Sequence, residues 1–356
     1  MKTDKKNRFI SMFDLESGFY MRTGVIDNDG IDTGVDPFMA TMPELIDIGI
    51  MKSCSNKING ICKVDCYQGG SSHLGQPNMS LDDYKKVVNQ VKGKTLQFAL
   101  GGRGDPNKHE NFKEILEYTK QNNIIPNYTT SGYNLTDEEI QITKDNCGAV
   151  AVSQYFCEAT DNAINRFIKA GCKTNMHFVL STETIDYAIN MLKNKSQYEG
   201  LNAVVFLIYK PIGLGQKGKV LSVEDVRVSE FFNLVDNGKH DFKIGFDSCS
   251  CGGIVNFTKN INLDSIDYCE AARFSCYLDA DMNLMPCSFG NQNPKYFVNL
   301  NEYTFKEAWN SQVFEDFRNS IKNSCVGCAK KHVCTPCPII RGITLCPTIQ
   351  KEKPAI

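Results

Sequence analysis

This chain of 356 residues contains 16 cysteines, and cysteine is the residue type here whose number and spacing most clearly suggest chemistry. Cys54, Cys62 and Cys66 lie close together with the spacing C-x7-C-x3-C. Three thiolates on one loop can ligate three irons of a 4Fe–4S cluster and leave the fourth iron open. An open metal position suits catalysis, because a substrate must coordinate there. A structural zinc site with His73 as a further ligand is the alternative at this segment.

A second, larger group of cysteines lies toward the C-terminal end. Its eight members are Cys269, Cys276, Cys287, Cys325, Cys328, Cys334, Cys337 and Cys346. Eight thiolates are enough for two fully ligated 4Fe–4S clusters. Paired cysteines at close spacing are also typical of zinc sites, so a zinc ribbon on the four cysteines from Cys325 to Cys337 is the alternative. That alternative leaves the other four cysteines unexplained.

Five cysteines belong to neither group. Cys249 and Cys251 precede the C-terminal array, at a place where a substrate could reach them. They are candidates for labile ligands or substrate-handling thiols, with a purely structural role as the alternative. Cys147, Cys157 and Cys172 lie near expected strands or helices and are interpreted as small buried hydrophobic residues.

The composition favours metal over disulfides as the reason for so many cysteines. The 39 Lys and Arg residues nearly balance 41 Asp and Glu, and a net charge of −2 gives no electrostatic reason to bind nucleic acid or an anionic membrane. No signal peptide follows Met1, and no apolar stretch is long enough to span a bilayer. We therefore expect a cytoplasmic protein, and in a reducing cytosol dense cysteine clusters indicate metal.

Six short apolar segments, separated by amphipathic ones, must position these residues. They are 45–50, 96–100, 124–128, 148–152, 176–180 and 203–209. Such runs are typical of strands buried on both faces of a parallel sheet. They predict an α/β fold, a partial (β/α)6 barrel with an irregular cysteine-rich C-terminal module, and an open doubly wound sheet is the alternative. The expected divisions are an N-terminal extension (1–44), the barrel (45–246) and the module (247–356).

Helix signals lie between the apolar segments. The predicted helix boundaries are Ser80 with Asp83, His109, Thr136 with Glu139, Gly171 as a C-terminal stop, and Ser222 with Asp225. Each strand–helix pair of this kind places the carboxyl end of its strand at one common edge of the sheet. Chemistry is expected at that edge.

Glycine and polar residues follow most of the predicted strands. The candidates at the strand ends are Gly101, Gly102, Arg103, Asp105, Ser131, Ser153, Gln154 and Ser181. The two glycines allow a close approach of the backbone to a ligand, and an ordinary glycine-rich turn is the alternative. His177 lies inside an apolar strand, where a hydrogen-bonded structural role is expected rather than catalysis.

The first cysteine segment resembles the radical S-adenosylmethionine (SAM) superfamily. The family's usual motif is C-x3-C-x2-C in the loop after the first barrel strand. The position matches in this chain, while both intervals are longer. The resemblance implies that Cys54, Cys62 and Cys66 hold a catalytic 4Fe–4S cluster. The aromatic residue that the family places near the adenine has Tyr67 as its nearest candidate here, since Asp65 stands in the usual position.

The turn Gly101-Gly102-Arg103 is similar to the Gly-Gly-Glu segment with which this family binds the SAM amino group. Arg103 stands in the acidic position, and Asp105 is the nearest residue that could supply the charge. The resemblance further implies that Ser153 and Gln154 contact the ribose.

The C-terminal cysteine array resembles the SPASM-type extension of radical SAM enzymes, a module with two auxiliary clusters. Met282 stands where that pattern has glycine, and the interval before Cys337 is one residue shorter. The segment 304–318 resembles the helix that precedes the second half of the module. The resemblance implies one cluster on Cys269, Cys276, Cys287 and Cys337, and the other on Cys325, Cys328, Cys334 and Cys346.

The resemblance also implies an activity. Such enzymes cleave SAM reductively to a 5′-deoxyadenosyl radical, which abstracts hydrogen from the substrate, and auxiliary clusters would accept an electron from the substrate radical. Many relatives modify peptides, so a peptide or protein substrate is expected, with cross-linking or side-chain oxidation as the reaction. An electron donor such as flavodoxin or ferredoxin is implied. The alternatives are a small-molecule substrate, or a zinc-binding interaction protein without catalysis.

Overall fold

A parallel sheet of seven strands, β4 to β10 in sequence order, forms the centre of the computed structural model, which describes residues 1–14, 16, 19–54, 62, 65–69 and 74–351. The strands are β4 (Leu45–Ile48), β5 (Gln97–Leu100), β6 (Ile125–Thr130), β7 (Ala149–Ser153), β8 (Thr174–Leu180), β9 (Ala203–Ile208) and β10 (Lys243–Phe246). One strand corresponds to each of the six predicted segments, which confirms the α/β prediction. The sequence does not predict β10, because Lys243 and Gly245 interrupt its apolar run.

The C-terminal module continues this sheet at its β4 edge. β11 (Ser275–Leu278) pairs in parallel with β4, so that Cys276 lies opposite Ile46 and Tyr277 opposite Asp47. β12 (Asn283–Met285) and β13 (Val298–Asn299) follow in antiparallel order. In the part of the chain that the structure describes, no ladder joins β10 to β4, so the barrel is partial as predicted. The division of the chain at residue 247 stays a prediction.

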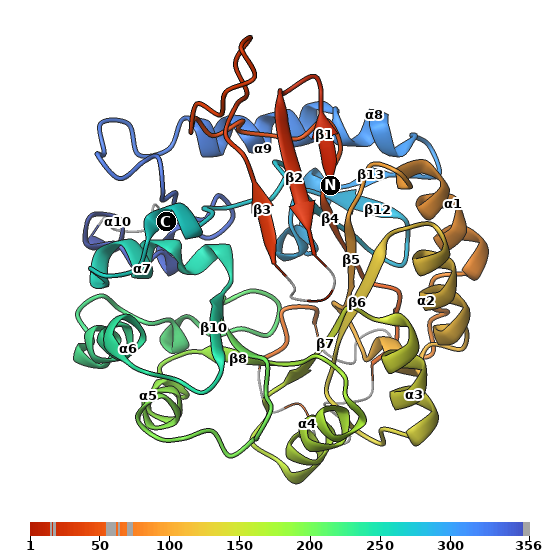
Figure 1. Cartoon of the computed structure of the whole chain (residues 1–356), viewed down its shortest axis with the longest axis horizontal. Helices are drawn as coiled ribbons and strands as arrows, with labels where there is room; N and C mark the ends of the chain where they lie inside the picture. Colours follow the sequence, from red (N-terminus) through yellow and green to blue (C-terminus); the bar gives the residue numbers. More distant parts are fainter. Residues whose placement is uncertain (15, 17–18, 55–61, 63–64, 70–73, 352–356) are drawn as a thin grey trace.

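Helices cover the outer face of the curved sheet (Figure 1). They are α1 (Leu81–Val91), α2 (Phe112–Gln121), α3 (Asp137–Asn146), α4 (Glu158–Ala170), α5 (Ile185–Lys193), α6 (Val226–Asn237), α7 (Cys251–Phe257), α8 (Phe305–Trp309), α9 (Gln312–Lys322) and α10 (Pro347–Lys351). Their buried apolar faces and the strands form one large core. Burial of this kind is the main force that holds each helix on the sheet. No helix in the described residues is both long and apolar enough to cross a membrane.

Most predicted helix boundaries are confirmed. The Ser80 side chain accepts a hydrogen bond from the Asp83 amide, Thr136 and Glu139 form a capping box, and Gly171 ends α4 at a φ of 82°. Two expectations were wrong. α2 begins at Phe112, since a short 3₁₀ turn precedes it and His109 lies between the two. Asp225 caps α6 in place of Ser222, because its carboxylate accepts from the Arg227 amide.

The first residues form a small antiparallel sheet of β1 (Lys2–Asp4), β2 (Phe9–Phe13) and β3 (Tyr20–Arg22). Buried ion pairs tie this part of the chain to the rest. Arg22 bridges Glu44 and Asp267, at 2.9 and 2.8 Å. Arg273, whose side chain is fully buried, pairs with Asp36. Figure 1 accordingly shows β1–β3 against the region where β4 meets the module.

Candidate functional site

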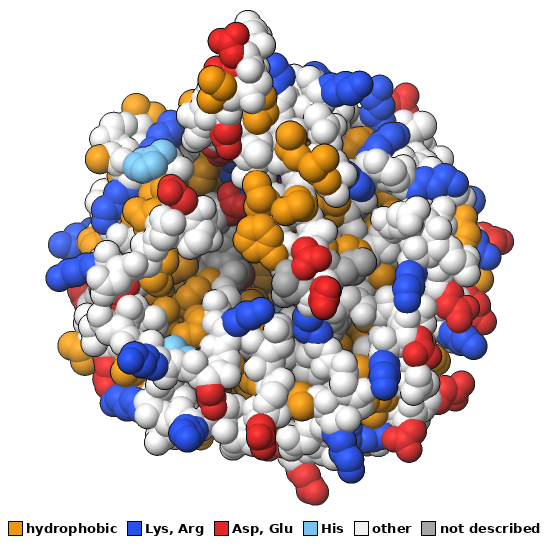
Figure 2. All heavy atoms as spheres, viewed as in Figure 1, with side chains coloured by type: hydrophobic (Ala, Val, Ile, Leu, Met, Phe, Trp, Pro, Cys, Tyr) orange, Lys and Arg blue, Asp and Glu red, His pale blue; other side chains and the backbone are white. Residues whose placement is uncertain are grey.

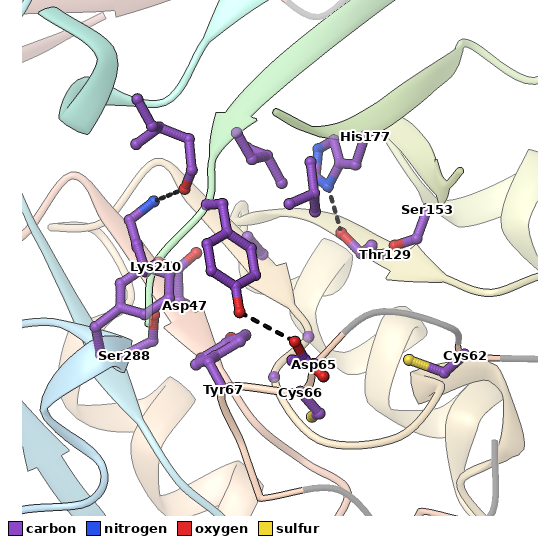
Figure 3. A pocket seen from close by; sticks show the side chains of 18 of the residues that line it. Asp47, Cys62, Asp65, Cys66, Tyr67, Thr129, Ser153, His177, Lys210 and Ser288 are labelled. Carbon is purple, nitrogen blue, oxygen red and sulfur yellow. Dashed lines mark hydrogen bonds between the residues drawn. The ribbon is translucent and has the colours of Figure 1, made fainter. Parts of the chain in front are cut away.

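The carboxyl ends of the parallel strands surround a cavity of about 380 Å³ (Figure 3). We call it the central cavity. The residues that line it and are used below are Asp47, Cys62, Asp65, Cys66, Tyr67, Gly101, Gly102, Thr129, Ser153, Gln154, Tyr155, His177, Tyr209, Lys210, Tyr277, Ser288 and Phe289. The first strands and the C-terminal module thus share one site, since Tyr277, Ser288 and Phe289 belong to the module.

The three cysteines of the first segment converge beside this cavity. Cys62 and Cys66 line it, and both join Cys54 around an adjoining cavity of about 90 Å³. Gly101, Gly102 and Asp105 line that smaller cavity as well. Three thiols facing one hollow next to a larger ligand-sized one fit a cluster with one open iron. His73, the alternative zinc ligand, lies outside the described residues.

The predicted glycine turn is a point of close approach between barrel and module. Gly102 has a φ of +92°, which side chains rarely adopt. A Cβ there would lie 2.5 Å from the Tyr277 hydroxyl, which also accepts a hydrogen bond from the Gln68 amide at 3.3 Å. A Cβ on Gly101 would meet nothing within 4 Å, because the cavity opens there.

The charged residues after this turn hold the strand ends together. Arg103 donates from Nη2 to the Gln68 carbonyl at 2.5 Å. The Asp105 carboxylate accepts from the Ser131 amide at 2.7 Å and from the Ser131 hydroxyl at 2.5 Å. Asp105 and Ser131 thus link the loops after β5 and β6, and Asp105 still borders the smaller cavity. Their roles toward a ligand stay predictions.

The predicted residues of later strands divide between two cavities. Ser153 and Gln154 line the central cavity. Gln154 accepts from the Phe156 amide at 2.6 Å and donates to the Tyr198 hydroxyl at 3.2 Å, which fixes its side chain. Ser181 lines a neighbouring cavity of about 190 Å³ instead, together with Tyr187. Asp65, Tyr155 and Tyr209 border both cavities, so the two adjoin.

The central cavity includes Asp47, which sequence reasoning did not single out, together with His177 and Tyr67, which it did. Asp47 is the one acidic residue in the first apolar segment, and burial raises its pKa to about 7. Burial lowers the pKa of His177 to about 4, so the ring is neutral at pH 7. Its Nδ1 lies 3.5 Å from the Thr129 hydroxyl. Tyr67 packs against Phe289, with ring centroids 4.6 Å apart. An isolated charge in a strand could have revealed Asp47.

Asp47 also borders another cavity, of about 760 Å³, between β3, β10 and α7. Its lining includes Ile244, Phe246, Ile254 and Ile266. Figure 2 shows this face of the molecule hollowed left of its centre, with hydrophobic side chains on the walls. The Asp47 carboxyl therefore stands between two hollows, in a surrounding that disfavours its charge.

The position of Asp47 predicts a pH-dependent stability. Its pKa rises from 3.8 in water to about 7 in the fold, so the folded state retains a proton that the unfolded chain has lost. The contribution of Asp47 to the free energy of unfolding is therefore fully present at low pH and is lost as the pH rises through 7. Replacement by Asn removes this loss. We expect Asp47→Asn to gain about 1–2 kcal/mol over the wild type between pH 5 and pH 8, a value reduced because the cavities admit water.

Unfolding temperatures of both proteins at a series of pH values, in the absence of oxygen, check this expectation. A difference that stays flat from pH 5 to pH 8 would contradict it. A variant that loses stability relative to the wild type as the pH rises would also contradict it.

A buried ion pair joins the end of β9 to the start of the module. Lys210 Nζ lies 2.5 Å from Asp247, and the side chains are only 3% and 19% exposed. Burial lowers the pKa of Lys210, but the Asp247 carboxylate and the nearby Cys249 and Cys337 thiols together more than offset this, so that its pKa is raised. The ammonium group also lies 4.5 Å from the centre of the Phe289 ring, at the wall of the central cavity.

The C-terminal cysteines fall into different places. Cys269, Cys337 and Cys276 are buried, Cys328 is exposed, and the other four are intermediate. Burial, the nearby Cys249 thiol and Cys269 raise the pKa of Cys287. Cys334 Sγ lies 3.9 Å from Cys251 Sγ.

Among the described side chains, no group of three has the spacing that the ligands of a single metal ion require. A 4Fe–4S cluster binds each thiolate through a different iron, so its ligands lie further apart.

Residues 269–338 match the SPASM family, described as an iron–sulfur cluster-binding domain. Structures similar to the whole chain include SuiB of Streptococcus suis bound to S-adenosylmethionine, with a TM-score of 0.63 and 13% identity over 88% of this chain and 78% of that chain. SuiB bound to its precursor peptide SuiA gives 0.62 and 12%, over 87% and 78%. The anSMEcpe structure with AdoMet and the Cp18Cys peptide gives 0.58 and 16%, over 82% and 88%.

No curated protein matches the chain in sequence. At these identities the structural matches establish the fold, and the SPASM match covers the C-terminal cysteine array except for Cys346. The chain therefore has a partial barrel with the fold of SuiB and anSMEcpe, and its residues 269–338 match the SPASM iron–sulfur cluster-binding domain, as the resemblance to SPASM-type radical SAM enzymes predicts.

Proposed function

We propose that this chain is a radical SAM enzyme that generates a 5′-deoxyadenosyl radical and abstracts hydrogen from a peptide or protein substrate. The observation that carries the proposal is the convergence of Cys54, Cys62 and Cys66 on a hollow beside the central cavity. An iron–sulfur cluster bound by these thiolates would supply the electron that cleaves SAM. The chain's own residues would bind and orient SAM and exclude water.

Each wall of the central cavity suits one part of SAM. The backbone of Gly101 and Gly102 can approach the amino acid portion closely. Tyr67 and Phe289 offer an aromatic surface for the adenine. Ser153 supplies a hydroxyl that could reach the ribose, from the end of β7.

Two observations support a peptide substrate. SuiB and anSMEcpe, which share the fold, have been crystallised with the peptides SuiA and Cp18Cys. In this chain Phe156 and Tyr187 line the neighbouring cavity. The two residues are 42% and 59% exposed, and their rings contact each other at a tilt of 37°, with centroids 4.7 Å apart. Exposed aromatic rings beside a catalytic cavity are suited to hold an apolar peptide side chain. Cross-linking or side-chain oxidation would then occur at the central cavity, with flavodoxin or ferredoxin as electron donor.

The first experiment is metal analysis followed by a SAM cleavage assay, on protein purified and reconstituted without oxygen. One open and two closed 4Fe–4S clusters correspond to about twelve irons with matching sulfide. With a chemical reductant, such a protein should release 5′-deoxyadenosine and methionine from SAM. Zinc alone, with no iron after reconstitution, would overturn the proposal in favour of a zinc-stabilised binding protein. About twelve irons without any 5′-deoxyadenosine would overturn the catalytic part.

The contact between Gly102 and Tyr277 predicts a specific loss of SAM affinity. Gly102→Ala would place a methyl group 2.5 Å from the Tyr277 hydroxyl and push that ring toward the cavity. We expect SAM binding to weaken by at least about tenfold, equivalent to about 1.4 kcal/mol. Equilibrium binding of SAM to the reconstituted protein is the measurement.

Gly93→Ala is the matched control. Gly93 also has a positive φ, of 78°, but a Cβ there meets nothing within 4 Å. Both variants strain the backbone by about 1 kcal/mol, so strain alone would affect stability equally. Equal SAM affinities of the two variants would show that the Gly102 turn does not contact SAM.

A further inference from the structure

We infer that Cys249, in the turn Cys249-Ser250-Cys251, is a ligand of an auxiliary cluster, in the place that the sequence pattern gives to Cys276. Cys249 would share one cluster with Cys269, Cys287 and Cys337. Cys251 would lie beside Cys334 next to the other cluster without binding it, because four cysteines already fill that cluster. The inference rests on the proposed iron–sulfur content and concerns the ligands of the module alone.

Cys249 is held at the meeting point of three other cysteines. Its thiol interacts with Cys337 and lies close to Cys269 and Cys287. Four buried or half-buried thiols that lie near one another can supply the four ligands of a closed 4Fe–4S cluster.

The backbone around Cys249 is fixed from both sides. The Asp247 amide donates to the Phe206 carbonyl at 3.0 Å, and the Ser250 hydroxyl donates to the Asp247 carboxylate at 2.6 Å. Asp247 also pairs with Lys210. On the opposite side, the Cys337 amide donates to the Thr344 hydroxyl at 3.1 Å, and the Ile340 amide contacts the Cys337 sulfur at 3.3 Å. Anchors of this kind hold ligands in place and orient them.

Cys276 faces away from that centre. Side chains alternate between the faces of a strand, and Tyr277 of β11 points into the central cavity toward Gly102. Cys276 therefore points to the outer face, and the charged side chains near it are Asp47 of β4 and Arg318 of α9. It is only 2% exposed and is paired in register with Ile46. A thiol held in this ladder cannot reach ligands on the inner face.

Cys251 brings the same turn close to another cysteine of the C-terminal array. Its sulfur lies 3.9 Å from that of Cys334. α7, which begins at Cys251, packs on the segment that follows Cys337, because the Asn256 side chain donates to the Leu345 carbonyl at 3.1 Å. A Cβ on Gly252 would lie 2.9 Å from Thr344, so the absence of a side chain permits this packing. The pair Cys249 and Cys251 thus faces the pair Cys337 and Cys334.

The test compares Cys249→Ala with Cys276→Ala in the reconstituted full chain. Iron and sulfide content and the EPR spectra of the reduced clusters are measured. The inference predicts that Cys249→Ala lowers iron from about twelve to about eight, or leaves a damaged cluster with a new EPR signal. Cys276→Ala should keep about twelve irons and the wild-type spectra. Iron lost from Cys276→Ala but retained in Cys249→Ala would overturn the inference.

Two further variants separate ligation from a packing defect. Cys249→Ser keeps the size of the side chain and offers an oxygen ligand, so it should retain iron but shift the EPR signal of one auxiliary cluster. An unchanged spectrum would mean that Cys249 is not a ligand. Cys251→Ala is the matched control from the same turn and should keep about twelve irons and the wild-type EPR signals. Equal loss of iron from Cys251→Ala and Cys249→Ala would mean that disturbed packing of the turn, and not a lost ligand, causes the effect.

These outcomes are distinguishable from failure of the proposed function. Protein that contains no iron would refute the proposed enzyme as a whole. Protein with about twelve irons that forms 5′-deoxyadenosine, yet keeps its iron and its EPR spectra when Cys249 is replaced, would refute only the ligand assignment.

Discussion

Simultaneous replacement of Cys54, Cys62 and Cys66 by alanine is expected to abolish the cleavage of SAM while the protein keeps about eight of about twelve irons. The three thiols lie around one hollow, and no cysteine of the C-terminal array lines that hollow or the central cavity. Loss of the three ligands should therefore empty one site and leave the others filled. We expect 5′-deoxyadenosine formation to fall by at least about three orders of magnitude, to the rate without enzyme.

Iron, sulfide and 5′-deoxyadenosine are measured on the same preparations. Cys172→Ala is the matched control, since Cys172 follows α4 on the outside of the barrel and has no place in either cavity. The control should keep all of its iron and its activity. Persistence of SAM cleavage in the triple variant would contradict the assignment of the catalytic cluster. A loss of all iron would contradict the separation of the first site from the module.

Local signals predicted most of the elements that position this site. Each apolar segment became a strand because a parallel sheet buries both faces of its strands, and the capping box of Thr136 and Glu139 formed as local hydrogen bonding dictates. The three cysteines and the turn at Gly101 met at the strand ends, since all parallel strands place their carboxyl ends at one edge. These features depend on residues that are neighbours in the sequence.

Other features depend on contacts between distant segments and left weaker signals. β11 is parallel to β4, although more than 200 residues separate them. Its register decides that Tyr277 faces the cavity and Cys276 the outside, and no spacing between cysteines contains that information. The single helix expected near residue 304 is two helices, α8 and α9, because α8 ends at Asn310 and the extended backbone of Ser311 separates the two. The spacing of the cysteines therefore predicts a number of clusters, while the assignment of ligands to each cluster depends on register.

Lys210→Met is expected to lower the free energy of unfolding by about 3 kcal/mol. Lys210 pairs with Asp247 at 2.5 Å, and its side chain is 3% exposed. Removal of the ammonium group leaves the Asp247 carboxylate in a poorly hydrated place, and uncompensated buried charges typically cost about 3–5 kcal/mol. The lower end applies because the Asp247 side chain is 19% exposed. Thermal unfolding of the reconstituted protein without oxygen, at one scan rate for all variants, is the measurement.

The double variant Lys210→Met with Asp247→Asn separates the charge from the packing. If the unpaired carboxylate causes the loss, the double variant should recover a large part of the stability that Lys210→Met loses, because no charge is left buried. Lys193→Met is the control, since Lys193 pairs with Glu230 at 2.6 Å on the surface and should cost less than about 1 kcal/mol. A double variant less stable than Lys210→Met would show that Asp247 contributes chiefly through its hydrogen bonds to Ser250, which hold the turn that carries Cys249 and Cys251.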